Sequence, residues 1–340
     1  MALGLLSKGA AWIPLEWVRP LSGVALVVPF YHMVSDAHVP HVSHLYRFRS
    51  VAEFNADLDF LCSHFEPVSL EDIVDALNGT RTLPESCFHL TFDDGFREMH
   101  DIVAPILHRA GVPATFFLTT AFLDGGGLSH YNVLSVLADK LQSGSVSGAA
   151  MARIEALLPA NGHAALIDRV VGISCTQKDR LCAMADALEV DVDEYVRETQ
   201  PHLTSAEVES LTRQGFSIGS HSHDHSRYEN LSLAGQLMQT RMSMDFLAAR
   251  FGARPRSFAF PHNDTGVSDE FFNTVFSERT IDVSFGTSGL VTRRHPRHIE
   301  RVSMEKTSAP ATRILARQFT RATYFRIWPH ADAPERSLKS

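Results

Sequence analysis

The sequence predicts an α/β fold in which parallel strands alternate with helices and close into a (β/α) barrel. Short apolar runs, of the kind found in strands buried on both faces, recur along the chain, and segments with helical spacing follow most of them. This alternation indicates parallel strands joined by right-handed crossovers, and the number of units favours a barrel over an open sheet. Reactive side chains in such a fold lie at the carboxyl ends of the strands.

The first half of the barrel is predicted from apolar runs and from one amphipathic pattern. Large apolar residues recur every three or four positions from Phe54 to Phe65, which places them on one helical face. A later helix ends at Gly111 and Pro113, neither of which continues a helix readily. The elements predicted in this half are strands at 24–31, 87–92 and 114–119 and helices at 51–65 and 98–110.

The second half repeats the alternation of strands and helices. Thr204 or Ser205 supplies the N-cap of one helix, because a hydroxyl oxygen can accept a hydrogen bond from a free N–H group of the first turn. The predicted strands lie at 216–219, 257–260, 282–285 and 299–304, and the predicted helices lie at 203–214 and 231–251. The first of these strands leads directly into a group of histidines.

Between the two halves the pattern changes to an Ala- and Leu-rich stretch with helical spacing. Three glycines at 125–127 form a flexible break before it. We expect a helical insertion over about 126–202, lying over the barrel mouth and shaping access to it. The other parts are an N-terminal helical segment at 1–20, the barrel over 21–325 and a loose polar tail at 326–340.

The composition is that of an ordinary globular protein, and it narrows the range of partners. Apolar residues make up 44% of the 340 positions and charged residues 21%, and the formal net charge is −8. No basic tract is present, which argues against nucleic acid as a partner. No run reaches the roughly 20 apolar residues that span a bilayer, so we expect no integral membrane segment.

The N-terminus and the cysteines bear on the compartment. The first 30 residues are apolar but interrupted by charges and prolines, and they lack a cleavage site, so we expect no signal peptide and a cytoplasmic protein. The four cysteines show no CxxC spacing and are expected to be reduced thiols. The segment from Ala2 to Val18 fits a short helix that packs on its own domain or touches a membrane surface peripherally.

Two adjacent carboxylates end one predicted strand, in the segment Thr91-Phe92-Asp93-Asp94-Gly95. Like charges a few ångströms apart repel each other, and a bound cation beside them removes this conflict. Gly95 allows the tight turn that directs both side chains into one pocket. The alternative is an Asp N-cap beside a solvated Asp, and the motif taken alone favours that alternative.

A histidine-rich segment, GSHSHDH at 219–225, follows a later strand. His221 and His225 are spaced i and i+4, which on one helical turn places both imidazoles beside the same ion. Two histidines and one carboxylate leave open positions for water and substrate, as in catalytic sites. We expect His223 to point elsewhere. A polar loop that happens to be rich in histidine is the alternative.

The two motifs, in this order, resemble those of the polysaccharide deacetylase, or NodB-homology, family. The similarity extends into the flanks, ILHRAGVPATFFLTTAFLD after the first motif and LTRQGFSIGSHSHDH around the second, and covers most of 24–125 and 203–305. It implies a deformed (β/α) barrel that removes acetyl groups from N- or O-acetylated glycans with a divalent metal. The resemblance makes Asp93 the general base and Asp94, His221 and His225 the metal ligands.

The general acid needs a separate prediction, because the late Leu-x-His motif of the family has no counterpart here. The segment 28–33 resembles the N-terminal Tyr-His strand of the permuted poly-N-acetylglucosamine deacetylases, which implies that His32 is the acid. His262 is the competitor, and a buried structural histidine is the alternative for His32. Arg301 is expected to reach Asp93 and hold it ionised, with a surface ion pair as its alternative.

Together these features predict a metal-dependent hydrolase that removes acetyl groups from an N-acetylated carbohydrate, whether polysaccharide, oligosaccharide or glycan precursor. The ligand set suits Zn²⁺ best, with Co²⁺ and Ni²⁺ as alternatives. Two other functions stay open. One is hydrolysis of a small-molecule or cyclic amide on the same fold, which an enclosed pocket would favour. The other is a non-catalytic barrel that binds glycan.

Overall fold

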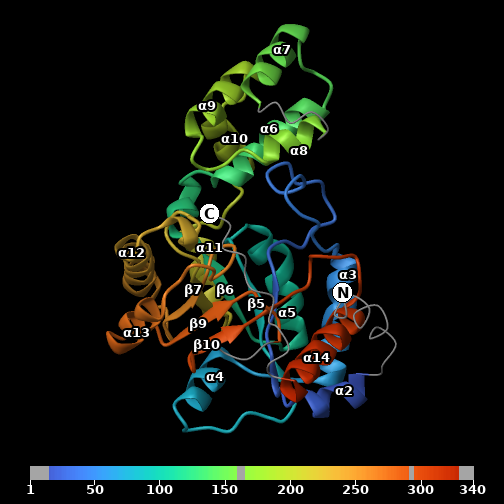
Figure 1. Cartoon of the computed structure of the whole chain (residues 1–340), viewed down its shortest axis with the longest axis vertical. Coiled ribbons are helices and arrows are strands. Elements are labelled where there is room, and N and C mark those ends of the chain that lie inside the picture. Colours follow the sequence, from blue (N-terminus) through green and yellow to red (C-terminus); the bar gives the residue numbers. More distant parts are fainter. Residues whose placement is uncertain (1–14, 159–164, 291–294, 329–340) are drawn as a thin grey trace.

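The computed structural model describes residues 15–158, 165–290 and 295–328, and it shows a barrel of strands surrounded by helices (Figure 1). The eight strands of the main sheet are β2 (Pro29–Tyr31), β5 (Leu90–Phe92), β6 (Ala114–Leu118), β7 (Ser217–Ser220), β8 (Ser257–Ala259), β9 (Val283–Gly286), β10 (His298–Glu300) and β11 (Val302–Ser303). All pair in parallel, in the spatial order β10-β9-β8-β7-β6-β5-β2-β11.

The two edge strands of this sheet are consecutive pieces of one segment. Only Arg301 separates β10 from β11 along the chain. β10 pairs with β9 and β11 pairs with β2, so this segment bridges the two edges and nearly closes the barrel. The deformed (β/α) barrel predicted from the sequence is confirmed.

A small three-stranded parallel sheet continues the barrel at the amino ends of two strands. It consists of β1 (Leu26–Val27), β4 (Cys87–Phe88) and β3 (Glu66–Pro67), in the order β1-β4-β3. β1 and β4 lead into β2 and β5, with only Val28 and His89 between them. The single strands predicted at 24–31 and 87–92 are therefore wrong in one respect. Each is divided in two, because the chain leaves one sheet and enters the other.

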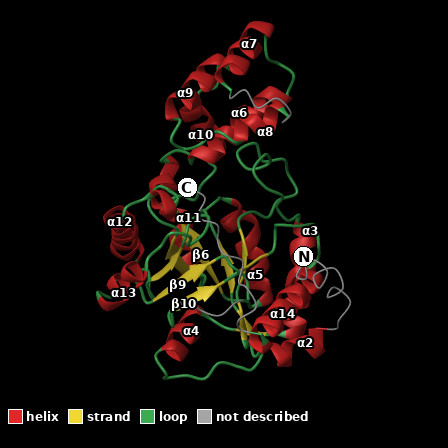
Figure 2. Ribbon diagram, viewed as in Figure 1, coloured by secondary structure: helices red, strands yellow, loops and turns green. Residues whose placement is uncertain are grey.

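Helices cover the outside of the barrel (Figure 2). They are α2 (Leu15–Ser22), α3 (Val51–His64), α4 (Leu70–Leu77), α5 (Ala104–Ala110), α11 (Ser205–Arg213), α12 (Leu233–Phe251), α13 (Asp269–Ser277) and α14 (Ala311–Ile327), with the short turns η2 (Met99–Val103), η3 (Thr120–Gly125) and η4 (Tyr228–Asn230). The sequence did not predict α4, α13 or α14. None of the described helices is long and apolar enough to cross a membrane.

The structure defines how two of the predicted helices begin. Thr204, not Ser205, is the N-cap of α11, where it forms a capping box. The helix predicted at 98–110 begins with the π-helical turn η2 and becomes α-helical only in α5. Pro105 has no N–H group to donate, and the change in hydrogen bonding accommodates it.

Both predicted chain ends lie partly outside the described residues. α14 continues to Ile327, so the tail predicted at 326–340 begins within a helix. Its residues from 329 onward, like residues 1–14 of the predicted N-terminal segment, lie outside the described part of the chain. Of that N-terminal segment, the structure describes α2, which packs beside α14 (Figure 1).

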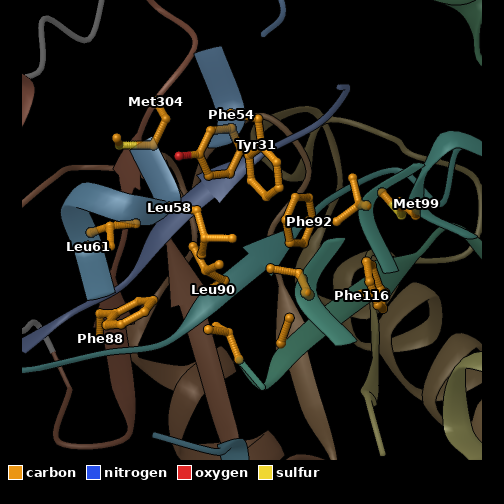
Figure 3. Close-up of a cluster of buried hydrophobic side chains, with 14 of the residues drawn as sticks. Tyr31, Phe54, Leu58, Leu61, Phe88, Leu90, Phe92, Met99, Phe116 and Met304 are labelled. Atoms are coloured by element: carbon orange, nitrogen blue, oxygen red, sulfur yellow. The ribbon is translucent and has the colours of Figure 1, made fainter. Parts of the chain in front are cut away.

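The largest hydrophobic core packs α3 against the strands of the barrel. Figure 3 shows Tyr31, Phe54 and Phe92 facing one another. The Tyr31 ring lies 5.2 Å from the Phe54 ring and 5.6 Å from the Phe92 ring, and all three side chains are buried. Burying each such ring stabilises the fold by about 1.5–3 kcal/mol. Because Tyr31 precedes His32 and Phe92 precedes Asp93, this packing fixes the backbone from which two predicted site residues project.

The stretch predicted as a helical insertion forms a lobe at one end of the barrel (Figure 1). Its helices are α6 (His130–Gln142), α7 (Gly148–Leu157), α8 (Leu166–Val171), α9 (Lys178–Ala187) and α10 (Val192–Thr199). They pack around a hydrophobic cluster of their own, which includes Leu134, Leu137, Ile154 and Met184. The lobe is therefore held together mainly by its own side chains.

Candidate active site

Asp93 directly follows β5 and is held by Arg301, the residue between the two closing strands. The guanidinium donates two parallel hydrogen bonds, from Nη1 to Oδ1 (2.6 Å) and from Nη2 to Oδ2 (2.7 Å), and both side chains are buried. Burial by itself raises the pKa of Asp93, but the Arg301 charge lowers it below its usual value. The carboxylate is therefore ionised at neutral pH. Arg301 makes this buried pair and not the surface pair considered as its alternative.

A sharp reversal of the backbone lets Asp94 reach the same pocket as Asp93. Asp94 has a φ of 74° and Gly95 a φ of 79°, both in the left-handed region. Four of the eight described non-glycine residues with positive φ belong to this site, namely Asp94, Ser222, His225 and His262. Strained backbone is thus concentrated where side chains must be aimed with precision.

The histidine segment after β7 is a loop, so the helical turn predicted from the i, i+4 spacing is wrong. Ser220 Oγ accepts a hydrogen bond from the Ser222 N–H group (3.2 Å), and Ser222 Oγ accepts one from His225 (3.1 Å). These local bonds replace those of a helix, and Ser222 and His225 adopt left-handed φ values of 66° and 62°. The loop still brings His221 and His225 together, with ring centroids 5.1 Å apart. His223 bonds instead to Thr120.

Asp94, His221 and His225 direct one atom each toward a common point. The two Nε2 atoms lie 3.4 Å (His221) and 3.1 Å (His225) from Asp94 Oδ1. His221 Nδ1 lies 2.9 Å from the carbonyl oxygen of Ala259, which can only accept, so Nδ1 carries the proton and Nε2 presents its lone pair. Asp94 Oδ1 is buried and has no hydrogen bond of suitable geometry to any residue that the structure describes. This donor set fits a divalent cation.

His32 follows β2 and is held by Glu305, which follows the neighbouring strand β11. Its Nδ1 atom lies 2.7 Å from Glu305 Oε2, and the same carboxylate accepts hydrogen bonds from the N–H groups of His32 and Met33. Burial by itself lowers the pKa of His32, but the Glu305 charge raises it to about 9. At neutral pH the ring is therefore protonated, with Nδ1–H bonded to Glu305 and Nε2–H as its second donor.

The pKa of His262, the competing candidate for the general acid, is shifted in the opposite direction from that of His32. Its ring lies 4.6 Å from that of His225, and its Nε2 atom is buried without a hydrogen-bond partner among the described residues. Burial, followed by the charges of His225 and Arg227, lowers the pKa of His262 to about 2. The ring is therefore neutral at physiological pH.

These side chains meet in one pocket of about 490 Å³ at the carboxyl ends of the strands. Asp93, Asp94, His32 and His225 line the pocket, whereas His221 and Arg301 are not part of the lining. The lobe also contributes, through Ser129, Tyr131, Asn132 and Val171. The pocket therefore combines chemistry carried by the barrel with a wall that comes from the insertion.

Solved structures of deacetylases have the same fold. PplD of Streptococcus pyogenes, a deacetylase solved in complex with acetate, gives a TM-score of 0.56 at 13% identity, over 85% of this chain and 96% of its own. IcaB from Ammonifex degensii gives 0.53 at 17% identity, over 87% and 98% of the two chains. A de-N-acetylase from Aggregatibacter actinomycetemcomitans gives 0.51 at 16% identity, over 84% and 97%.

The fold and the cluster at its strand ends define a deformed (β/α) barrel with a candidate metal centre. The sequence profile of the polysaccharide deacetylase family matches residues 80–148 and 178–274, which contain both motifs. The chain belongs to this family. Of residues 149–177, which the profile leaves unmatched, those that the structure describes lie in the helical lobe. No curated protein matches the sequence.

Proposed function

We propose that this protein is a metal-dependent hydrolase that removes the acetyl group from an N-acetylated carbohydrate. The observation that carries the proposal is the different surroundings of two adjacent carboxylates. Asp93 is paired with Arg301, whereas Asp94 faces the two imidazoles. A general base has to stay ionised and apart from the cation, whereas a ligand has to face it. Membership of the polysaccharide deacetylase family supports the choice of carbohydrate.

We infer that Asp94, His221 and His225 hold the divalent cation. Two imidazoles and one carboxylate suit Zn²⁺ best, with Co²⁺ and Ni²⁺ as alternatives. Three protein ligands are the number found in catalytic zinc sites, which keep a position open. When bound, such an ion polarises the acetyl carbonyl and lowers the pKa of a water molecule.

Two residues that line the same pocket as Asp94 and His225 carry the protons in the proposed reaction. Asp93 accepts the proton of the water that attacks the acetyl carbonyl carbon, and Arg301 holds it ionised for this step. His32 donates a proton to the amine nitrogen as the C–N bond breaks, so that acetate and an amine leave. Glu305 supports this role because it keeps the imidazole protonated, whereas His262 is neutral.

Acetate release from N-acetylated amino sugars tests the proposal. We expect the purified, Zn²⁺-loaded protein to release acetate, to lose this activity when a chelator removes the metal, and to regain it when the metal is restored. A panel of N-acetylated mono- and oligosaccharides in several linkages covers the range of substrates. If no member of the panel yields acetate, the proposed function is wrong.

Replacing Glu305 by Gln is expected to move the alkaline limit of activity to lower pH. An enzyme whose acid is His32 loses activity as the pH rises through the pKa of that ring, because the neutral form has no proton to give. Glu305 raises this pKa to about 9, and without its charge burial lowers the value. We expect the alkaline fall of kcat to shift by about one pH unit or more, a differential interaction of ~1.4 kcal/mol or more.

The measurement is kcat for the wild type and for Glu305→Gln between pH 6 and pH 10. His262→Gln is the control, since it removes the competing histidine and should leave the alkaline limit in place. An alkaline limit that moves in the His262 variant and not in the Glu305 variant would assign the acid to His262.

A small-molecule amide is a second candidate substrate, because the lobe walls the pocket on one side. A volume of about 490 Å³ lies within the range of small-ligand sites. The same acetate assay, extended to simple N-acetyl amides and cyclic amides, compares the two candidates directly. Faster turnover of these amides than of any N-acetylated sugar would favour the second.

A further inference from the structure

A loop after β2 and a helix of the lobe contact each other near the end of β5, the strand that precedes the paired carboxylates. β5, which leads into Asp93 and Asp94, lies between β2 and β6 in the sheet. The loop at 38–46 follows β2, and the lobe helix α6 follows β6. In this loop His41 lies against Phe96, just beyond β5, with the two ring centroids 5.4 Å apart. Both segments line the pocket, the loop through His44 and Tyr46 and the helix through Asn132.

One face of α6 makes the connection to the loop. The contacts include Asn132 Nδ2 to the carbonyl oxygen of His41 (2.8 Å), Ser135 Oγ to that of Pro40 (2.6 Å), and Asp139 Oδ1 to His44 Nε2 (3.2 Å). The three helix residues are spaced i, i+3 and i+7, which puts them on one side of the helix. Asn132 and Ser135 are buried. Because a buried polar group left without its partner is costly, these bonds hold the two segments together.

A contact on the other side fastens the start of α6 to the loop that carries His225. Arg227 Nε donates a hydrogen bond to the Tyr131 hydroxyl (3.0 Å), and the guanidinium carbon lies 5.5 Å from the centre of the Tyr131 ring. The same ring lies 5.3 Å from that of His262. Tyr131 and Asn132 both line the pocket. Contacts on two sides thus hold the first turn of α6 in place, where it forms one wall of the pocket.

We propose that this wall restricts the enzyme to a terminal acetylated sugar residue and excludes residues inside a glycan chain. The inference rests on the deacetylase function proposed above. A sugar residue inside a glycan chain has a neighbour on each side. An enzyme that acts on such a residue needs a groove that continues past the carboxylates in two directions. The wall formed by α6 and the loop at 38–46 closes one of them. A chain end has a single neighbour and fits a pocket of about 490 Å³.

The test uses the full-length, Zn²⁺-loaded protein with N-acetylglucosamine oligomers from the monomer to the pentamer, in β-1,4 and in β-1,6 linkage. Mass spectrometry counts the acetyl groups lost, and fragmentation locates them. We expect one acetyl group lost per chain, from a terminal residue, whatever the chain length. Loss from internal residues of the pentamer would overturn the inference and leave the proposed function intact. If no oligomer loses acetate, the proposed function fails and the inference fails with it.

A variant with a weakened wall gives a second readout. Asn132→Ala combined with Ser135→Ala removes three hydrogen bonds to the loop, one of them from the His44 N–H group to Ser135 Oγ. The ratio of internal to terminal deacetylation in the pentamer should rise about tenfold, which corresponds to ~1.4 kcal/mol. Gln142→Ala, at the exposed end of the same helix, is the matched control and should keep the terminal preference. If the double variant does not fold, Tyr131→Ala is the wall variant to test in its place. An unchanged ratio in a folded wall variant would overturn the inference.

Discussion

Asp93→Asn should lower kcat by about 10²- to 10⁴-fold, the range that general acid–base catalysis contributes. The amide keeps the shape of the side chain, but it cannot accept a proton from the attacking water at neutral pH. The metal content should stay the same, because Asp94 Oδ1 lies 3.1–3.4 Å from both imidazoles, whereas Asp93 approaches only that of His221, at 4.0 Å. Steady-state acetate release and elemental analysis measure the two quantities. Turnover close to that of the wild type would contradict the role proposed for Asp93.

The same substitution should also destabilise the fold, since it leaves the buried Arg301 guanidinium without its counter-charge. Removing one partner of a buried pair costs about 3–5 kcal/mol, and the amide oxygen, which can still accept a hydrogen bond, reduces this cost. Asp57→Asn is the matched control, because Asp57 Oδ2 lies 3.1 Å from Arg49 Nε in another buried pair that does not line the pocket. Both variants should unfold at lower temperature. Only Asp93→Asn should lose turnover.

The candidate site could be predicted where its chemistry is contained in short segments at strand ends. Asp93 and Asp94 follow β5, and His221 follows β7. Because the carboxyl ends of parallel strands meet at one end of a barrel, a correct strand prediction brings such residues together. The conformation of the histidine loop could not be predicted in this way. The i, i+4 spacing fits a helix, and the hydrogen bonds of Ser220 and Ser222 that replace the helix carry no distinctive pattern.

The sequence predicted the distant pair of Arg301 and Asp93, but other partnerships between distant parts of the chain could not be predicted from it. Glu305 is 273 positions from His32, and the two meet only because β11 pairs with β2 as the barrel closes. The register of that pairing is a property of the folded sheet. The bonds between α6 and the loop at 38–46 are of the same kind, since Asn132 and His41 are 91 positions apart. The sequence predicted that the insertion is helical, but it did not predict which side chains attach these helices to the pocket.

Asp94→Asn and His225→Asn are expected to lose the metal, and activity with it. Asn tolerates the left-handed backbone that both positions require, with φ values of 74° and 62°, so the substitutions test ligation without adding strain. Loss of a group that only orients a ligand costs about 10- to 100-fold in metal affinity, so loss of a direct ligand should cost more than ~100-fold. Competition with a chromophoric chelator measures the Zn²⁺ affinity of each variant.

His223→Asn is the control for these two variants, because His223 belongs to the same loop but bonds to Thr120 instead of facing Asp94. It should bind Zn²⁺ like the wild type. The informative result is the pattern across four variants, with the metal lost in those of Asp94 and His225 and retained in those of Asp93 and His223. If Asp93→Asn also loses the metal, both carboxylates hold the cation. The base would then have to be a different residue of the pocket, and the division of roles between the two adjacent aspartates would be wrong.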